Sequence, residues 1–181
     1  NYFSVPGVTG QVVQFDIVGN KFNVEMLASD APQSVSNFLA YVADQSYTST
    51  IIHRALGLNG ASNRVVQGGG YNTDFNAITR KAPIPLEYKL ANTRGTLAMA
   101  RSSEQNSATS EWFFNVDDNT TALGAGNGGG YAVFGRVIGT GMNVVDAVVA
   151  LPVYPVGALT NVPLRDIQSG QNKATLANLW N

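Results

Sequence analysis

The chain has 181 residues, of which 13% are charged, a formal net charge of −1 and no cysteine. This composition provides no basic surface for nucleic acid and excludes disulfides and thiolate metal sites. No apolar run approaches the ~18 residues of a membrane span. We expect one domain, 1–181, with a core over about 12–167 and a C-terminal tail, 171–181, of unassigned structure. A surface poor in charge favours an exported, for example periplasmic, protein over a cytoplasmic one.

The first part of the chain predicts a hairpin followed by a helix. Apolar and polar residues alternate over 10–27, which indicates two strands with their turn at Gly19–Asn20. Residues 29–45 place apolar side chains at helical spacing on one face. Pro32 falls in the first helical turn, where a missing N–H costs little, and Asp30 or the serine before it is expected to cap the helix.

The rest of the chain combines short strand-like runs with loops rich in glycine and asparagine. A second helix is expected over 141–152, with apolar residues on one side and Pro152 as its stop. Two helices among many short strands indicate a mainly β fold, a closed antiparallel barrel with the helices packed over its ends. The remaining strands are expected at 49–52, 64–67, 95–100, 111–116, 131–138 and 163–170.

Three candidate motifs have plain structural alternatives. The glycine-rich run 124–130 contains a G-x-G-x-x-G match, but a strand-like segment follows it, so a surface loop is favoured over a nucleotide site. His53 is the only histidine, and without a second histidine or a cysteine we predict no metal and no cofactor. A packing role for His53 is favoured over a Ser-His-Asp hydrolase, because no G-x-S-x-G elbow is present. Arg54 beside it could form a salt bridge on the barrel wall.

Five segments of the chain become specific when they are taken together. In order they are APQSVSNFLAYVADQSYTSTIIHR, VVQGGGY, NTRGTLAMARSSEQNSATSEWFFNV, YAVFGRVIGTGMNVVDAV and LTNVPLRDI. From about Val12 to about Ile167 the chain thereby resembles the cyclophilins, which are peptidyl-prolyl cis–trans isomerases, and in particular their bacterial branch. The resemblance implies a closed eight-stranded antiparallel barrel capped by two helices. It also implies isomerisation of X–Pro bonds in peptides and unfolded proteins, without a cofactor.

The resemblance further implies a site around Arg54. An X–Pro bond isomerises over a barrier of about 20 kcal/mol that is set by amide resonance, so no nucleophile, base or metal is required. In the family, the arginine that matches Arg54 donates to the prolyl amide as conjugation is lost, which stabilises the twisted state more than either planar one. Gln67 is implied to orient this arginine, and Phe113 to floor the proline pocket. The other implied substrate contacts are Ala100, Arg101 and Ser102 along the peptide-pairing edge, and Leu123 and Tyr131 at the pocket wall.

The segment after Arg54 departs from the family pattern. Twelve residues separate Arg54 from Gln67, several more than is usual in the family. If the extra residues all precede the family's F-M-x-Q pattern, Val65 replaces its substrate-contacting methionine and Arg64 replaces the pocket phenylalanine directly before it. Leu56 or Leu58 is a candidate to fill the gap.

Two further departures bear on activity and on ligands. Glu111 stands where the family has glutamine, and we hypothesise that its carboxylate pairs with Arg54 or Arg64 and lowers activity. Ala122 replaces a tryptophan of many eukaryotic members, and Trp112 is expected to face away from the pocket, so we expect weak cyclosporin binding. The expectation is therefore a monomeric isomerase with reduced activity. The alternative is a non-enzymatic proline-peptide-binding or scaffold protein on the same barrel.

Overall fold

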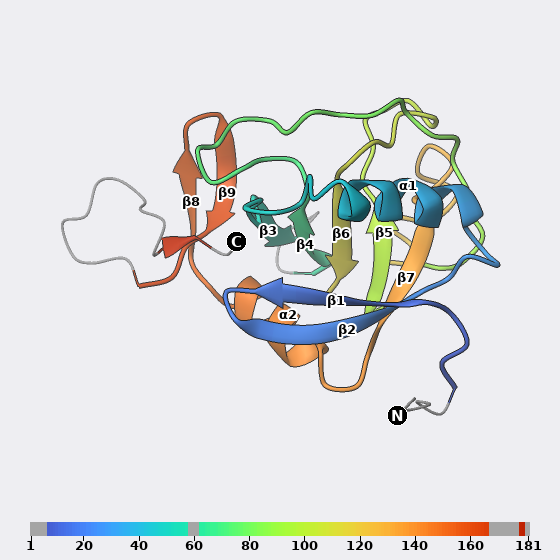
Figure 1. Ribbon diagram of the computed structural model, residues 1–181, viewed down its shortest axis with the longest axis horizontal. Helices are drawn as coiled ribbons and strands as arrows, with labels where there is room; N and C mark the ends of the chain where they lie inside the picture. The colour runs from blue at the N-terminus through green and yellow to red at the C-terminus, as the bar shows by residue number, and fades with distance from the viewer. Residues whose placement is uncertain (1–6, 58–61, 167–177, 180–181) are drawn as a thin grey trace.

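The computed structural model describes residues 7–57, 62–166 and 178–179 (Figure 1). This part of the chain forms two helices, α1 (Pro32–Ala43) and α2 (Met142–Val149), and nine strands. The strands are β1 (Val12–Ile17), β2 (Asn20–Met26), β3 (Arg54–Gly57), β4 (Arg64–Gly68), β5 (Thr96–Met99), β6 (Trp112–Asn115), β7 (Val133–Ile138), β8 (Val153–Val156) and β9 (Leu159–Pro163).

The nine strands form one sheet in the order β1-β2-β7-β5-β6-β4-β3-β9-β8. Neighbouring strands are antiparallel, except that β3 and β9 run parallel with Arg54 opposite Asn161. Strands β1 and β8 stand at the two ends of this order, so the sheet is open. The predicted closed eight-stranded antiparallel barrel is therefore wrong in strand number, in the direction of one pair and in closure. The mainly β class and the two helices are confirmed.

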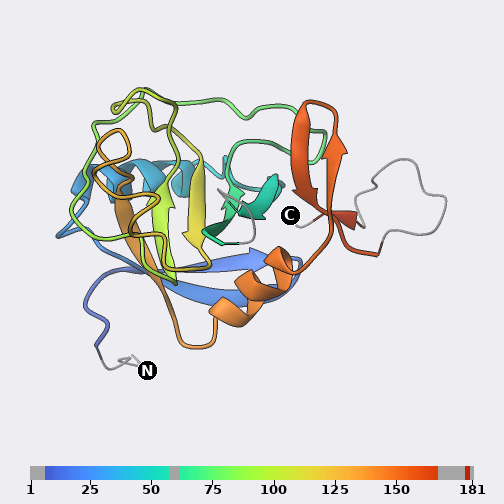
Figure 2. The same cartoon turned by 180° about the vertical axis from the view of Figure 1, so that it is seen from behind.

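The β8–β9 hairpin accounts for the extra strand and for the mixed sheet. It stands at one side of the molecule, drawn in orange-red in Figures 1 and 2. Residues 152–163 contain three prolines. Proline has no backbone N–H to donate to a neighbouring strand, so this segment does not look like a strand in the sequence. Pro155 is tolerated because β8 is an edge strand. The strand predicted at 163–170 is wrong over residues 164–166, and 167–170 lie outside the described residues.

The structure places the first hairpin turn and the start of β3 at different residues from those predicted. The first hairpin pairs Ile17 with Asn20, so its turn residues are Val18 and Gly19, which both have positive φ angles of 53° and 78°. The strand expected at 49–52 forms only an isolated bridge at Thr50, and β3 begins later, at Arg54.

Helix α1 begins as its proline predicts but is capped from elsewhere in the chain. Pro32 occupies the first turn, whereas neither Asp30 nor its neighbour caps the helix. The Glu87 carboxylate instead accepts hydrogen bonds from the backbone N–H groups of Gln33 (3.0 Å) and Ser34 (2.7 Å). Helix α1 packs against β7, and α2 packs against β3 and β4, on the opposite side of the molecule (Figure 1). No helix in the described ranges is long and apolar enough to cross a membrane.

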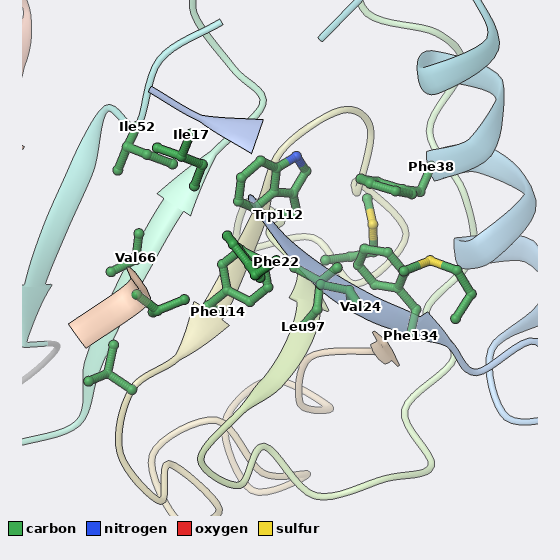
Figure 3. Close-up of a cluster of buried hydrophobic side chains, with 14 of the residues drawn as sticks. Ile17, Phe22, Val24, Phe38, Ile52, Val66, Leu97, Trp112, Phe114 and Phe134 are labelled. Atoms are coloured by element: carbon green, nitrogen blue, oxygen red, sulfur yellow. The ribbon is translucent and has the colours of Figure 1, made fainter. Parts of the chain in front are cut away.

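The side chains of the sheet divide between two faces. One face carries the main core, in which Trp112 and Phe114 both meet the ring of Phe15 on β1. Phe114 also meets the ring of Phe22 on β2, and Figure 3 shows Trp112, Phe114, Phe22 and Phe38 in this core. A cavity of about 310 Å³ opens beside this core, between β1, the end of α1 and the segment leading to β3. The other face carries a smaller cluster that includes Phe113. Neighbouring residues of β6 therefore serve different clusters, as alternation along a strand requires.

Asn178 and Leu179, the last described residues, pack beside the β8–β9 hairpin. Leu179 is buried against Ile51, Val162 and Leu164, and the Asn178 side chain donates to the carbonyl of Arg165 at 2.8 Å. The other residues of the predicted tail lie outside the described part of the chain.

Candidate active site

Three adjacent strands align Arg54, Gln67 and Phe113 in one row. The register places Arg54 opposite Gln67 across β3 and β4, and Gln67 opposite Phe113 across β4 and β6. Directly paired residues point to the same face of a sheet, so the three side chains project together. Arg54 donates from one terminal nitrogen to the Gln67 side-chain oxygen at 3.3 Å, and its other side-chain N–H groups have no partner among the described residues.

An apolar cluster borders this row. Phe113 is 4% exposed and meets the ring of Tyr131 edge-on, with 5.8 Å between centroids. Val65 and Leu123 are buried in the same cluster, and Ala100 lies half-buried against it. The structure thus brings together the residues that the sequence predicted for a proline pocket. Their roles toward a substrate remain predictions.

Arg101 and Ser102 form hydrogen bonds to other residues of the chain. The Arg101 guanidinium lies 4.4 Å over the Tyr131 ring and donates to the carbonyls of Asn127, Gly128 and Gly130 at 3.0 to 3.1 Å. It therefore ties the glycine-rich loop to the end of β5 and to Tyr131. A strand, β7, follows this loop, as the sequence indicates. The backbone N–H of Ser102 donates to the Ser107 hydroxyl at 2.9 Å.

Sequence reasoning missed two buried asparagines behind the pocket. Asn92 donates to the carbonyls of Leu123 (3.3 Å) and Tyr131 (3.0 Å), the two ends of the loop that carries pocket residues. Asn115 in turn donates to the Asn92 side-chain oxygen at 3.0 Å. Both side chains are fully buried. A polar residue inside the apolar run WFFNV was the available signal, because a buried amide requires partners.

Glu111 contacts three side chains that come from different parts of the chain. Its Oε2 accepts from the Gln67 amide at 2.8 Å and lies 3.4 Å from Nε2 of His53, while Oε1 accepts from Arg80 at 3.1 Å. Burial alone would raise the pKa of Glu111, but His53, Gln67 and Arg80 outweigh it and hold the pKa below its ordinary value. The carboxyl is therefore ionised at neutral pH.

The hypothesised pairing of Glu111 with Arg54 or Arg64 is not what the structure shows. Among the described residues, Glu111 reaches Arg54 only through Gln67. The Arg64 guanidinium instead binds Asp117 through two of its nitrogens, at 2.8 and 3.0 Å. Arg64 therefore does not take the place of a pocket phenylalanine.

Leu56 takes a position beside the pocket. It lies directly opposite Val65 in the β3–β4 pair, on the face that carries Arg54 and Gln67. It is 38% exposed. Leu58, the other candidate, lies outside the described residues.

His53 has the packing role that its sequence context favours. Its side chain is 6% exposed and meets the Tyr71 ring edge-on, with 4.9 Å between centroids. Its Nδ1 atom has no hydrogen-bond partner within the described part of the chain.

Comparison with known proteins identifies the family. The model of the family described as cyclophilin type peptidyl-prolyl cis-trans isomerase/CLD matches residues 12–168. A peptidyl-prolyl cis-trans isomerase of Acinetobacter baylyi is 42% identical over 153 residues, which cover 83% of this chain and 78% of that protein. Peptidyl-prolyl cis-trans isomerase B of Escherichia coli is 40% identical, over 76% of this chain and 83% of its own. The chain therefore belongs to the cyclophilin-type peptidyl-prolyl cis–trans isomerases.

A solved structure supports the fold independently. The cyclophilin type isomerase of Cryptosporidium parvum, determined in the presence of the dipeptide Ala-Pro, superimposes with a TM-score of 0.62 at 22% identity. The match covers 83% of this chain and 91% of that one. The recognition made from the five sequence segments is confirmed, although the closed barrel expected with it is not.

Proposed function

We propose that this protein isomerises X–Pro bonds of peptides and unfolded proteins, with Arg54 as the catalytic group. The observation that carries the proposal is the row of Arg54, Gln67 and Phe113 across β3, β4 and β6. A proline ring against Phe113 would bring its amide toward the N–H groups of Arg54 that do not bind Gln67. A donor at the prolyl nitrogen stabilises the twisted amide more than the planar one. When the bond twists, the nitrogen lone pair is no longer delocalised into the carbonyl and can accept a hydrogen bond.

We propose that turnover is reduced relative to relatives with a fuller pocket. Val65 presents less surface than methionine, and Arg64 is held by Asp117 rather than filling a pocket wall. The lost apolar contact with a proline ring is worth ~1–3 kcal/mol. Leu56 offsets part of this loss, since it lies next to Val65.

The test is the cis-to-trans rate of an Ala-Pro tetrapeptide with and without the protein. The Ala-Pro dipeptide of the Cryptosporidium parvum structure supports this choice of probe. Acceleration above the uncatalysed rate supports the isomerase. Binding of the tetrapeptide without acceleration would instead support the proline-peptide-binding scaffold.

The exposure of Leu56 leads to a prediction about affinity. Leu56→Ala should raise KM for the tetrapeptide about threefold and leave kcat within about twofold, because a fraction of one leucine's transfer free energy is lost from ground state and transition state alike. Val12→Ala provides a matched control, since Val12 is similarly exposed, at 42%, but lies on β1. An unchanged KM in Leu56→Ala would show that the substrate does not reach this side chain.

Ala122 leads to a prediction about cyclosporin. Ala122 is half-buried beside the Phe113 cluster, while Trp112 lies in the main core on the opposite face. We expect a Kd weaker than about 1 µM by calorimetric titration, and a gain of at least about tenfold in Ala122→Trp. Submicromolar binding by the unaltered protein would contradict this expectation.

We also propose a monomer that acts outside the cytoplasm. The low charged fraction of 13% supports the second part. Sedimentation of the purified protein and fractionation of the source cells would test the two parts separately.

A further inference from the structure

A clamp of three side chains surrounds the Glu111 carboxylate beside the proposed catalytic row. Arg80 reaches it from the segment after β4, His53 from the residue before β3, and Gln67 from β4 itself. The carboxyl group also packs closely against Gly70: a Cβ added at this glycine would lie 2.8 Å from the Glu111 carboxyl carbon, so a larger residue there would displace it. The Glu111 side chain is 20% exposed and that of His53 is 6% exposed, so water screens their contact poorly, whereas Arg80 is 49% exposed.

The chemistry of these groups determines the orientation of the Gln67 amide. An ionised carboxylate only accepts hydrogen bonds and a guanidinium only donates them. Gln67 lies between the two, so its NH₂ group must face Glu111 and its oxygen must face Arg54. A glutamine at position 111 would lack this constraint, because an amide can satisfy either end of the Gln67 amide.

We propose that Glu111, held by Arg80 and His53, is a positioning residue that fixes the Gln67 amide and, through it, the Arg54 guanidinium. This inference rests on the proposed function of Arg54. The anchored guanidinium keeps its remaining donors aimed at the pocket instead of rotating among several positions. The charge of Glu111 is balanced by Arg80 at 3.1 Å and is not paired directly with Arg54. Glu111 therefore supports turnover, contrary to the inhibitory role that the sequence suggested.

The first experiment compares Glu111→Gln, Gln67→Ala and the double variant in the full chain. In Glu111→Gln, kcat should fall about three- to tenfold and KM should change less than about twofold. In the Gln67→Ala background, Glu111→Gln should have no further effect, because the hydrogen-bonded relay from Glu111 through Gln67 to Arg54 is already broken. A purely structural role of Glu111 would give additive losses instead.

A second readout does not depend on activity. The side-chain NH₂ resonances of Gln67 in a two-dimensional ¹H–¹⁵N NMR spectrum should shift or broaden in Glu111→Gln. Unchanged Gln67 resonances, or a kcat that rises in Glu111→Gln, would overturn the inference. Complete inactivity of the intact protein would overturn the proposed function, and the Gln67 resonances would still decide whether Glu111 fixes that amide.

Arg80 supplies a test through pH. In the intact protein, the donors around Glu111 keep its pKa low, so the relay is present at neutral pH and is lost only as the pH falls through this lowered pKa. The charged and titratable groups facing the carboxylate are Arg80 and His53. Arg80→Met should therefore move the acidic fall of kcat to higher pH. Lys81→Met is the matched control, because Lys81 pairs with Asp44 and should leave the profile unchanged. Identical profiles in Arg80→Met and the intact protein would contradict the clamp.

Discussion

Arg54→Ala is expected to isomerise an Ala-Pro tetrapeptide with a kcat/KM at least about tenfold below that of the intact protein. A tenfold loss corresponds to ~1.4 kcal/mol of transition-state stabilisation. The physical reason is that a donor to the prolyl amide interacts more strongly with the twisted amide than with either planar isomer. Because Arg54 is only half-buried and its partner is an uncharged glutamine, its removal should leave the fold intact. The measurement is the tetrapeptide rate, with a thermal melt of each variant.

Two further variants test whether the loss of rate is due to the guanidinium of Arg54. Arg54→Lys keeps a positive charge but loses the planar set of donors, so its rate should lie between those of the intact protein and Arg54→Ala. Arg94→Ala removes an arginine that pairs with Asp146 on α2 and should leave the rate unchanged. A full rate in Arg54→Ala would show that the catalytic group lies elsewhere.

Replacing the two neighbouring phenylalanines of β6 should have different effects, mainly on stability for Phe114 and mainly on activity for Phe113. Phe114 is fully buried, and its ring centroid lies 5.2 Å from that of Phe15 and 5.4 Å from that of Trp112. Phe114→Ala should lower the free energy of unfolding by about 3–5 kcal/mol, because it leaves a cavity in the main core. Guanidinium unfolding measures this loss, and Phe114→Leu, with a smaller cavity, remains folded if alanine is not tolerated.

Phe113→Ala is the matched variant on the other face of the sheet. It should lower kcat/KM at least about tenfold, because the proline ring loses its largest contact, and it should destabilise the fold less, since its cluster is smaller. Activities are compared well below each unfolding midpoint, so that only folded protein is measured. If Phe114→Leu loses as much activity as Phe113→Ala, the faces do not divide core from pocket.

The sequence by itself determined the family, both helices and the main residues of the proposed site. Helix and strand periodicities depend on near neighbours, so they can be read from the chain, as the opposite faces of Trp112 and Phe113 were. The resemblance then singled out Arg54, Gln67 and Phe113. The register of β3, β4 and β6 places these residues side by side.

Only the tertiary structure decided which distant groups meet. The sequence allows Glu111 to pair with any nearby cation, and the fold brings Arg80 and His53 to its carboxylate. Glu87 caps α1 across a sequence separation of 54 residues, which no local pattern could reveal. The prolines of 152–163 concealed the β8–β9 hairpin, and its parallel pairing with β3 made the sheet mixed. Such contacts join residues that are distant in the chain. They form, and stabilise the protein, only when packing and strand register have brought those residues together, so local sequence patterns do not reveal them.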